Sequence, residues 1–172
     1  FICCSNLETI HVDSKNPNYV SIDDALFTKD IQTLILYPCK NKRTKYTIPS
    51  SITTIGEDVF YQCSSLVQIT IPASVTSIEA NPFTGCSSLE TINVDSKNPN
   101  YVAIDDVLFT KDIRTLICYA CKNKRTTYTI PSSVTSIGYN AFYKCISLTR
   151  ITIPSSVKSM QYNPFTGCSS LE

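Results

Sequence analysis

Cysteine is the residue type with the most chemical potential in this chain, because nine of the 172 residues are cysteines. Cys4, Cys63, Cys86, Cys145 and Cys168 recur at one position of a repeating pattern. Equivalent positions of stacked repeats lie about 4.8 Å apart, a distance that permits the disulfides Cys63–Cys86 and Cys145–Cys168. Stacked side chains point the same way, however. The pattern therefore favours buried free thiols that pack as small apolar groups, with the two disulfides as the alternative.

Cys118 and Cys121 form a single C-x-x-C motif, the spacing of a redox or zinc half-site. A zinc site needs a second cysteine pair or histidines, and the only histidine, His11, is replaced by Asn93 in an internal copy of its segment. Cys118 is likewise replaced by Leu36. We expect a structural role for the motif, and no metal or cofactor.

Catalytic arrangements are not supported either. A single histidine leaves little room for a Ser-His-Asp or Cys-His site. The acidic pairs Asp23-Asp24 and Asp105-Asp106 are adjacent residues of predicted turns, where neighbouring side chains diverge. We expect that the protein is not an enzyme.

A fixed period organises the whole chain. Its units are residues 4–39, 40–62, 63–85, 86–121, 122–144 and 145–167, and the pattern of one long and two short units occurs twice. Such a period predicts a solenoid, in which neighbouring units complete each other's core. Neither end has the polar cap that normally closes a repeat array, so we expect residues 1–172 to be a fragment of a longer protein.

The short unit 63–85 shows the expected elements. Leu66, Ile69 and Ile71 alternate as the inward face of a strand, Pro72 ends it, and a second apolar run and Phe83 close the unit. The same reading places Leu7, Ile10 and Val12 on a first strand and makes Ile153 and Met160 inward residues. We expect a single helical or 3₁₀ turn over 56–62 and over 138–144.

The long units contain extra residues with turn and strand chemistry. Residues 19–22, 25–28 and 33–37 read as three strands of a β-meander, and the same residues recur between 95 and 119. We therefore expect a right-handed, strand-rich solenoid with a parallel sheet on one face, short turns or 3₁₀ pieces on the other, and a β-meander insertion in each long unit.

Ligand binding is expected on the outward side of the first strands, since solenoids present that sheet as an extended surface. Alternation places these side chains outside: Thr9, His11, Lys45, Thr47, Gln68, Thr70, Thr91, Asn93, Thr127, Thr129, Arg150 and Thr152. Two basic clusters are candidate contacts for an anionic ligand: Lys40, Lys42 and Arg43, and Lys122, Lys124 and Arg125. A solvated turn is the alternative for both clusters.

The unit C-x-x-L-x-x-I-x-I-P-x-x-V-x-x-I-x-x-x-x-F, read from Cys63 to Phe83, resembles the BspA-like class of leucine-rich repeats. The long unit resembles the expanded variant with N-x-x-Y and L-F-x-K-D motifs. The resemblance implies a surface or secreted adhesin-like protein that binds a protein or glycan of host matrix or neighbouring cells, without catalytic residues. An intracellular leucine-rich-repeat scaffold is the alternative, favoured by apparently unpaired cysteines and by the absence of an N-x-[ST] sequon.

Charge and hydropathy point to no further partner class. Lysine plus arginine total 15 against 14 aspartate plus glutamate, so no global charge drives the chain toward nucleic acid. The sequence contains no run of 18 or more apolar residues, which is the length that would predict a membrane-spanning helix.

Overall fold

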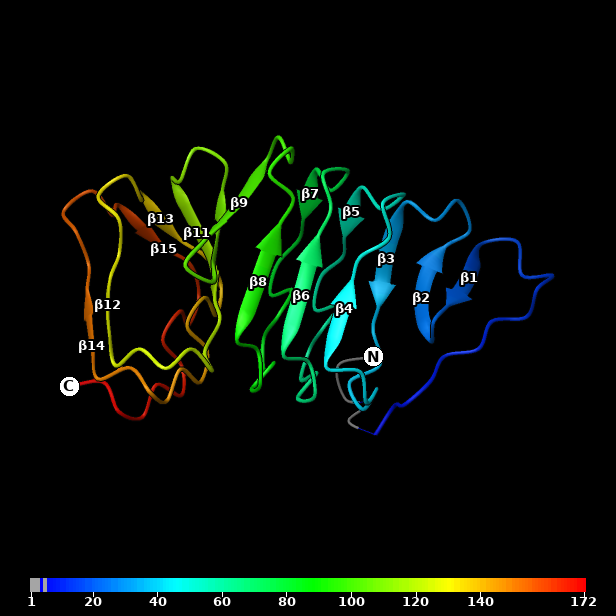
Figure 1. Cartoon of the computed structure of the whole chain (residues 1–172), viewed down its shortest axis with the longest axis horizontal. Coiled ribbons are helices and arrows are strands. Elements are labelled where there is room, and N and C mark those ends of the chain that lie inside the picture. Colours follow the sequence, from blue (N-terminus) through cyan, green and yellow to red (C-terminus); the bar gives the residue numbers. More distant parts are fainter. Residues whose placement is uncertain (1–3, 5) are drawn as a thin grey trace.

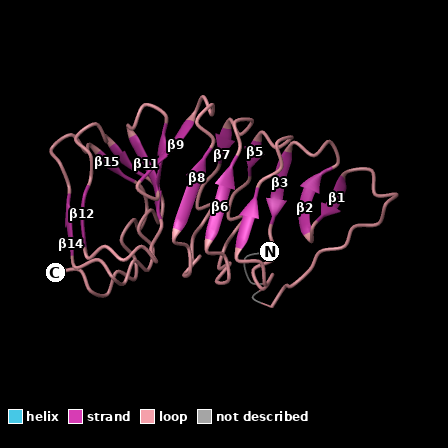
Figure 2. Cartoon of the chain, in the orientation of Figure 1, coloured by secondary structure: helices cyan, strands magenta, loops and turns pink. Residues whose placement is uncertain are grey.

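The computed structural model describes residue 4 and residues 6–172, and within them it contains strands and turns but no helix (Figure 2). Successive units follow one another along the long axis of the molecule (Figure 1). The expected strand-rich solenoid is confirmed. Its two faces are built from different strands of each unit.

The first face contains the first strands of the units. Strands β4 (Lys45–Thr47), β6 (Gln68–Ile71) and β8 (Thr91–Val94) form a parallel sheet, and β12 (Thr127–Thr129) and β14 (Arg150–Thr152) form a second one. Tyr46, Ile69 and Ile92 occupy one register position and are all buried. This stacking of every second side chain is what the apolar alternation predicted.

The second face is also a sheet, which corrects the expectation of turns or 3₁₀ pieces. The second apolar run of each short unit forms a two-residue strand: β5 (Thr54–Ile55), β7 (Ser77–Ile78), β13 (Ser136–Ile137) and β15 (Ser159–Met160). These strands pair in parallel with their neighbours. Stacking at a constant spacing lets even a two-residue run form ladder hydrogen bonds.

The helical turns expected over 56–62 and 138–144 are absent, and both segments form simple turns. Their amides donate to the next unit instead of continuing a helix. Phe60 N–H donates to Pro82 O at 3.0 Å and Gln62 N–H to Thr84 O at 2.8 Å. Inter-unit hydrogen bonds therefore replace the intrahelical ones.

Each long unit contains the predicted β-meander. In the first copy, β1 (Tyr19–Ile22), β2 (Ala25–Thr28) and β3 (Thr33–Leu36) pair antiparallel. In the second, β9 (Tyr101–Ile104), β10 (Val107–Thr110) and β11 (Thr115–Tyr119) do the same. The β1–β2 loop is only Asp23-Asp24, with φ angles of 50° and 70°, as a two-residue primed turn requires. The last meander strand then continues the second face, since β3 pairs with β5 and β11 with β13.

The N-x-x-Y motif attaches the second meander to the preceding unit. Asn98 is buried, and its Nδ2 donates to Pro72 O at 2.8 Å and to Val75 O at 3.0 Å. The Tyr101 hydroxyl accepts a hydrogen bond from Ile78 N–H at 2.9 Å. The counterparts Asn16 and Tyr19 make no such inter-unit bond within the described residues, and Tyr19 is 44% exposed.

The first face is not continuous, which was not predicted. Residues 6–18 contain no strand, so the strand expected around Leu7 and Ile10 is absent, and β8 does not pair with β12. At both places a backbone hydrogen bond joins the first residue of the short unit to the long unit before it, at a point that we call the corner. Beyond the corner the two segments of the first face do not pair. The corner bonds are Lys40 N–H to Leu7 O at 2.9 Å and Lys122 N–H to Leu89 O at 3.0 Å.

The core follows the same division into two copies. Neighbouring aromatic rings follow one another along it at centroid distances of 5.2–5.3 Å, as Tyr37, Phe60 and Phe83 and as Tyr119, Phe142 and Phe165. The Tyr37–Phe60 pair is tilted, and the other three pairs are stacked. The inward assignments of Leu66, Ile69, Ile71 and Phe83 are confirmed by their burial. Ile153 and Met160 are 42% and 47% exposed, contrary to expectation, because no later unit packs against them within the described residues.

Candidate ligand-binding surface

The outward side chains of β4, β6 and β8 form two parallel rows, which we call the threonine face. Strand register aligns Lys45, Gln68 and Thr91 in one row and Thr47, Thr70 and Asn93 in the other. All six are exposed or partly exposed, whereas the residues between them are buried. The pleat that buries Ile69 therefore turns Gln68 and Thr70 toward solvent.

The remaining predicted face residues do not join these rows. Thr127 aligns with Arg150 and Thr129 with Thr152 in the separate β12–β14 sheet, where all four are exposed. Thr9 and His11 are exposed too, but they lie on the extended segment that leaves the first face. Twelve predicted residues thus fall into one larger patch, one smaller patch and an isolated segment.

The chemistry of the threonine face is that of hydrogen bonding. Hydroxyl and amide groups can donate and accept, Lys45 adds one positive charge, and no aromatic side chain provides a large apolar anchor. Within the residues that the structure describes, no group of three or more His, Cys, Asp or Glu side chains could hold a metal ion. The described part also has no helix long and apolar enough to span a bilayer.

The two basic clusters are only partly available to a ligand. Arg43 donates from Nη1 to Asp23 O at 2.9 Å and forms an ion pair with Asp23 Oδ1 at 3.4 Å. Arg125 repeats this with Asp105, at 3.0 Å to the carbonyl and 3.7 Å to the carboxylate. Both arginines therefore hold the turn of a meander. The exposed lysines of the clusters are Lys40, Lys42, Lys122 and Lys124.

One shallow groove lies away from these residues. It has a volume of about 380 Å³ and is bordered by Glu79, Asn81, Tyr101 and Tyr139, where the third unit meets the second long unit. Partial burial raises the pKa of Tyr101. None of the residues predicted to bind a ligand lines this groove.

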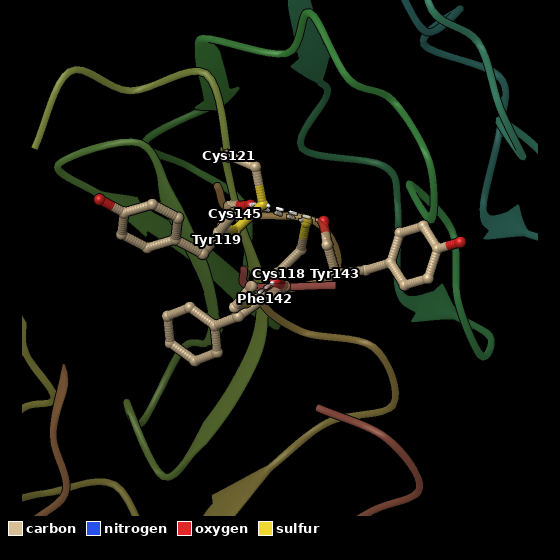
Figure 3. The surroundings of a disulfide bond; sticks show 7 residues. Cys118, Tyr119, Cys121, Phe142, Tyr143 and Cys145 are labelled. Carbon is tan, nitrogen blue, oxygen red and sulfur yellow. Dashed lines mark hydrogen bonds between the residues drawn. A yellow bond between two sulfur atoms is a disulfide. The ribbon is translucent and has the colours of Figure 1, made fainter. Parts of the chain in front are cut away.

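The cysteines gave an outcome that sequence reasoning missed. Cys121 and Cys145 form a disulfide, with their Cα atoms 4.4 Å apart (Figure 3). The alternative pair Cys145–Cys168 is thereby excluded, because Cys145 is already bonded and Cys168 is a thiol. The expectation of a free thiol at Cys145 was therefore wrong. In the C-x-x-C motif, Cys121 cross-links two turns of the solenoid, and the two cysteines of the motif do not pair with each other.

The outcome for the other cysteines that open units is mixed, because Cys4 is an exposed thiol and Cys168 is a partly buried one, whereas buried thiols were expected. Cys63 and Cys86 are buried thiols, as the packing interpretation predicted. Cys118 is buried as well, and burial raises the pKa of its thiol to about 12. A thiol in this environment packs as an apolar group and is a poor nucleophile at neutral pH.

Comparison with known proteins places the chain among leucine-rich-repeat proteins. The family model "BspA type Leucine rich repeat region" matches residues 29–116 and 111–172, with six copies. No protein with curated annotation matches the sequence.

Solved structures share the fold. A leucine-rich repeat protein from Eubacterium ventriosum superposes with a TM-score of 0.71 at 30% identity, over 74% of this chain and 40% of that one. A leucine rich cell surface protein from Faecalibacterium prausnitzii gives 0.66 at 29% identity, over 98% and 41%. The pneumococcal vaccine antigen PcpA gives 0.66 at 23% identity, over 77% and 39%, which shows the fold alone. The matched region is therefore about two-fifths of each of these proteins.

The family-model match covers well over half of the chain, and the repeat pattern, the paired strand faces and the solved relatives agree with it. The chain belongs to the BspA-type leucine-rich-repeat family.

Proposed function

We propose that this chain is a non-catalytic adhesion and interaction module of a cell-surface protein, and that it binds protein or glycan ligands of host matrix or neighbouring cells through the threonine face. The observation that carries the proposal is the register of that face. Three hydrogen-bonded parallel strands hold six polar side chains in two rows of matching register. A preorganised polar surface of this kind pays little ordering entropy when it binds a partner.

Two further observations support surface exposure. Disulfides form and persist in secreted and surface proteins and are rare in the cytosol, and this chain has the disulfide Cys121–Cys145. One of the related solved proteins is described as a leucine rich cell surface protein. The alternative function, an intracellular scaffold, rests on the remaining thiols such as Cys63 and Cys86, whose burial also fits a surface protein.

The threonine face favours modest affinity for each binding site. It lacks the buried aromatic or arginine anchors that dominate tight interfaces. Strength then comes from repetition, because linked sites raise the effective concentration of ligand at each other. The smaller β12–β14 patch, with Arg150 beside Thr127, provides a second polar site in the same chain.

The test combines location and binding. Intact source cells are labelled with a membrane-impermeant biotin reagent, and the protein is detected with an antibody to this chain. Labelling on intact cells supports a surface module, whereas labelling only after lysis favours the scaffold. The chain is then screened against immobilised matrix proteins and glycans.

A matched pair of variants locates the binding surface. Thr70→Arg places a bulky charge at the centre of the threonine face, and Ser77→Arg places the same group on the exposed side of β7, on the second face. We expect Thr70→Arg to abolish binding and Ser77→Arg to preserve it. Equal binding by both variants would rule out the threonine face.

A further inference from the structure

The disulfide Cys121–Cys145 has an exact internal counterpart in sequence. Cys39 occupies in the first copy the position of Cys121, and Cys63 occupies that of Cys145. In the second copy the bond joins adjacent turns of the solenoid, since Cys121 directly precedes unit 122–144 and Cys145 opens the next unit. The first copy therefore has both cysteines needed for the same cross-link.

The backbone around the two pairs is held in the same way. Three backbone hydrogen bonds of the first copy recur in the second. Tyr37 N–H to Val59 O (3.0 Å) corresponds to Tyr119 N–H to Ala141 O (2.8 Å), and Asn41 N–H to Pro38 O (3.1 Å) corresponds to Asn123 N–H to Ala120 O (3.0 Å). Cys63 N–H to Phe60 O corresponds to Cys145 N–H to Phe142 O, both at 3.1 Å. These bonds flank both partners of each pair. The first copy therefore shares these hydrogen bonds with the bonded pair, whose Cα atoms are 4.4 Å apart.

The Cys63 sulfur lies near the carbonyl that corresponds to one beside the disulfide of the second copy. The Cys63 Sγ lies 3.8 Å from Tyr37 O, and in the second copy the Cys121 sulfur lies 3.3 Å from Tyr119 O, the matching carbonyl. Cys39 is partly exposed, and its thiol donates to Cys4 O at 3.3 Å. Formation of the bond requires the Cys39 side chain to rotate away from this carbonyl.

Cys86 is the competing partner for Cys63, and the second copy argues against it. The Cys86 thiol donates to Phe60 O at 3.0 Å, and its counterpart Cys168 donates to Phe142 O at 2.9 Å. In the second copy Cys168 keeps this hydrogen bond while Cys145 bonds to Cys121. By the same division of roles, Cys86 remains a thiol and Cys63 is left for Cys39.

We propose that Cys39 and Cys63 form a second disulfide, so that each long unit is cross-linked to the following turns at the same point. Glutathione disulfide is a sufficient oxidant. The accessible Cys39 thiolate attacks it, releasing one glutathione thiol and leaving a mixed disulfide, and the Cys63 thiolate then displaces the second glutathione. The two cysteines lose two protons and two electrons in total, and glutathione disulfide takes them up to become two thiols.

The test is peptide mapping of the full chain. The protein is equilibrated with glutathione disulfide, free thiols are alkylated, and trypsin is combined with a glutamate-specific protease so that Cys63 and Cys86 fall on different peptides. We expect residues 30–40 to be linked to residues 58–79. The link between 115–122 and 145–150 reports the known disulfide and serves as the internal control.

Three results would overturn the proposal: an alkylated Cys39, a link from Cys39 to any other cysteine, or a link between residues 58–79 and 80–90, which would join Cys63 to Cys86. Stability gives a second readout. Under non-reducing conditions, Cys39→Ser should lower the melting temperature by about as much as Cys121→Ser does. In dithiothreitol, the Cys39→Ser variant should have the same melting temperature as the wild type. A Cys39→Ser variant that melts like the wild type without reductant also contradicts the bond.

Discussion

Replacing Asn98 by alanine tests how a long unit is attached to the unit before it. The Asn98 side chain is 1% exposed and makes four hydrogen bonds. Two cross to the previous unit, at Pro72 O and Val75 O, and two are local, accepted from the amides of Asn100 and Tyr101 at 2.9 and 2.8 Å. Its counterpart Asn16 makes only the local pair, both at 2.9 Å. The chain thus contains its own control.

The size of the effect follows from this difference. Each hydrogen bond contributes about 1 kcal/mol net, and a buried partner left unsatisfied costs somewhat more. Asn98→Ala should therefore lower the free energy of unfolding by about 4 kcal/mol. Asn16→Ala loses two bonds at a partly exposed site and should cost about 1–2 kcal/mol. The gap of at least about 2 kcal/mol measures the inter-unit attachment.

Thermal unfolding followed by circular dichroism checks this expectation. For a chain of this size a gap of about 2 kcal/mol corresponds to roughly 4–8 °C in melting temperature. Hydrogen exchange should also accelerate at the amides of Asn100 and Tyr101 in the Asn98→Ala variant. Equal melting temperatures for the two variants would refute the reasoning, because they would show that the bonds to Pro72 and Val75 contribute nothing.

Three other predictions concern the core, the disulfide and alkaline pH. Ile69→Asp should unfold the β4–β6–β8 sheet, because it places an unpaired carboxylate at a fully buried position. The neighbouring outward substitution Gln68→Ala should change the free energy of unfolding by less than about 0.5 kcal/mol. Similar denaturant midpoints for the two variants would contradict the inward assignment of Ile69. Cys121→Ser opens a loop with a sequence separation of 24 and should cost about 3 kcal/mol in non-reducing buffer, measured as a lower denaturant midpoint; an unchanged midpoint would count against the bond. Burial raises the pKa of Tyr37 to about 12, so the folded state holds a proton that the unfolded state loses from about pH 10 upward. Its contribution to stability is present below about pH 10 and is lost as pH rises through 12, at up to about 1.4 kcal/mol per pH unit, and Tyr37→Phe should flatten that fall in a series of urea titrations.

The sequence predicted those parts of the fold that are decided within one unit. Alternation from Leu66 to Ile71 identified the buried side of the first strand, and the meander strands of the first long unit were placed almost to the residue. These predictions succeed because side-chain periodicity and two-residue turns such as Asp23-Asp24 are local properties. The outward rows of the threonine face follow from the same alternation, although their role in binding remains a proposal.

Features that depend on how units stack were not predictable in the same way. The strand Thr54–Ile55 is only two residues long, which is too short to be recognised as a strand from the sequence. It forms because Thr33–Leu34 and Ser77–Ile78 pair with it on either side. The break between β8 and β12 likewise arises between units. The last strand of each meander already pairs with the next unit on the second face, so nothing in the sequence of a long unit requires its first strand to pair with that unit as well.

The disulfide shows which signal could have been used. The repeat pattern assigns Lys40 and Lys122 to the position that cysteine occupies elsewhere, and a lysine ammonium group is almost never fully buried. Both lysines are exposed, and in each case the residue just before them is a cysteine. A one-residue shift at the corner therefore presents Cys121 toward Cys145 and leaves Lys122 in solvent. The physical cost of burying lysine, applied to the dipeptide Cys121-Lys122, leads to the pair Cys121–Cys145 that the structure contains. Applied to Cys39-Lys40, it leads to the pair Cys39–Cys63 that we propose.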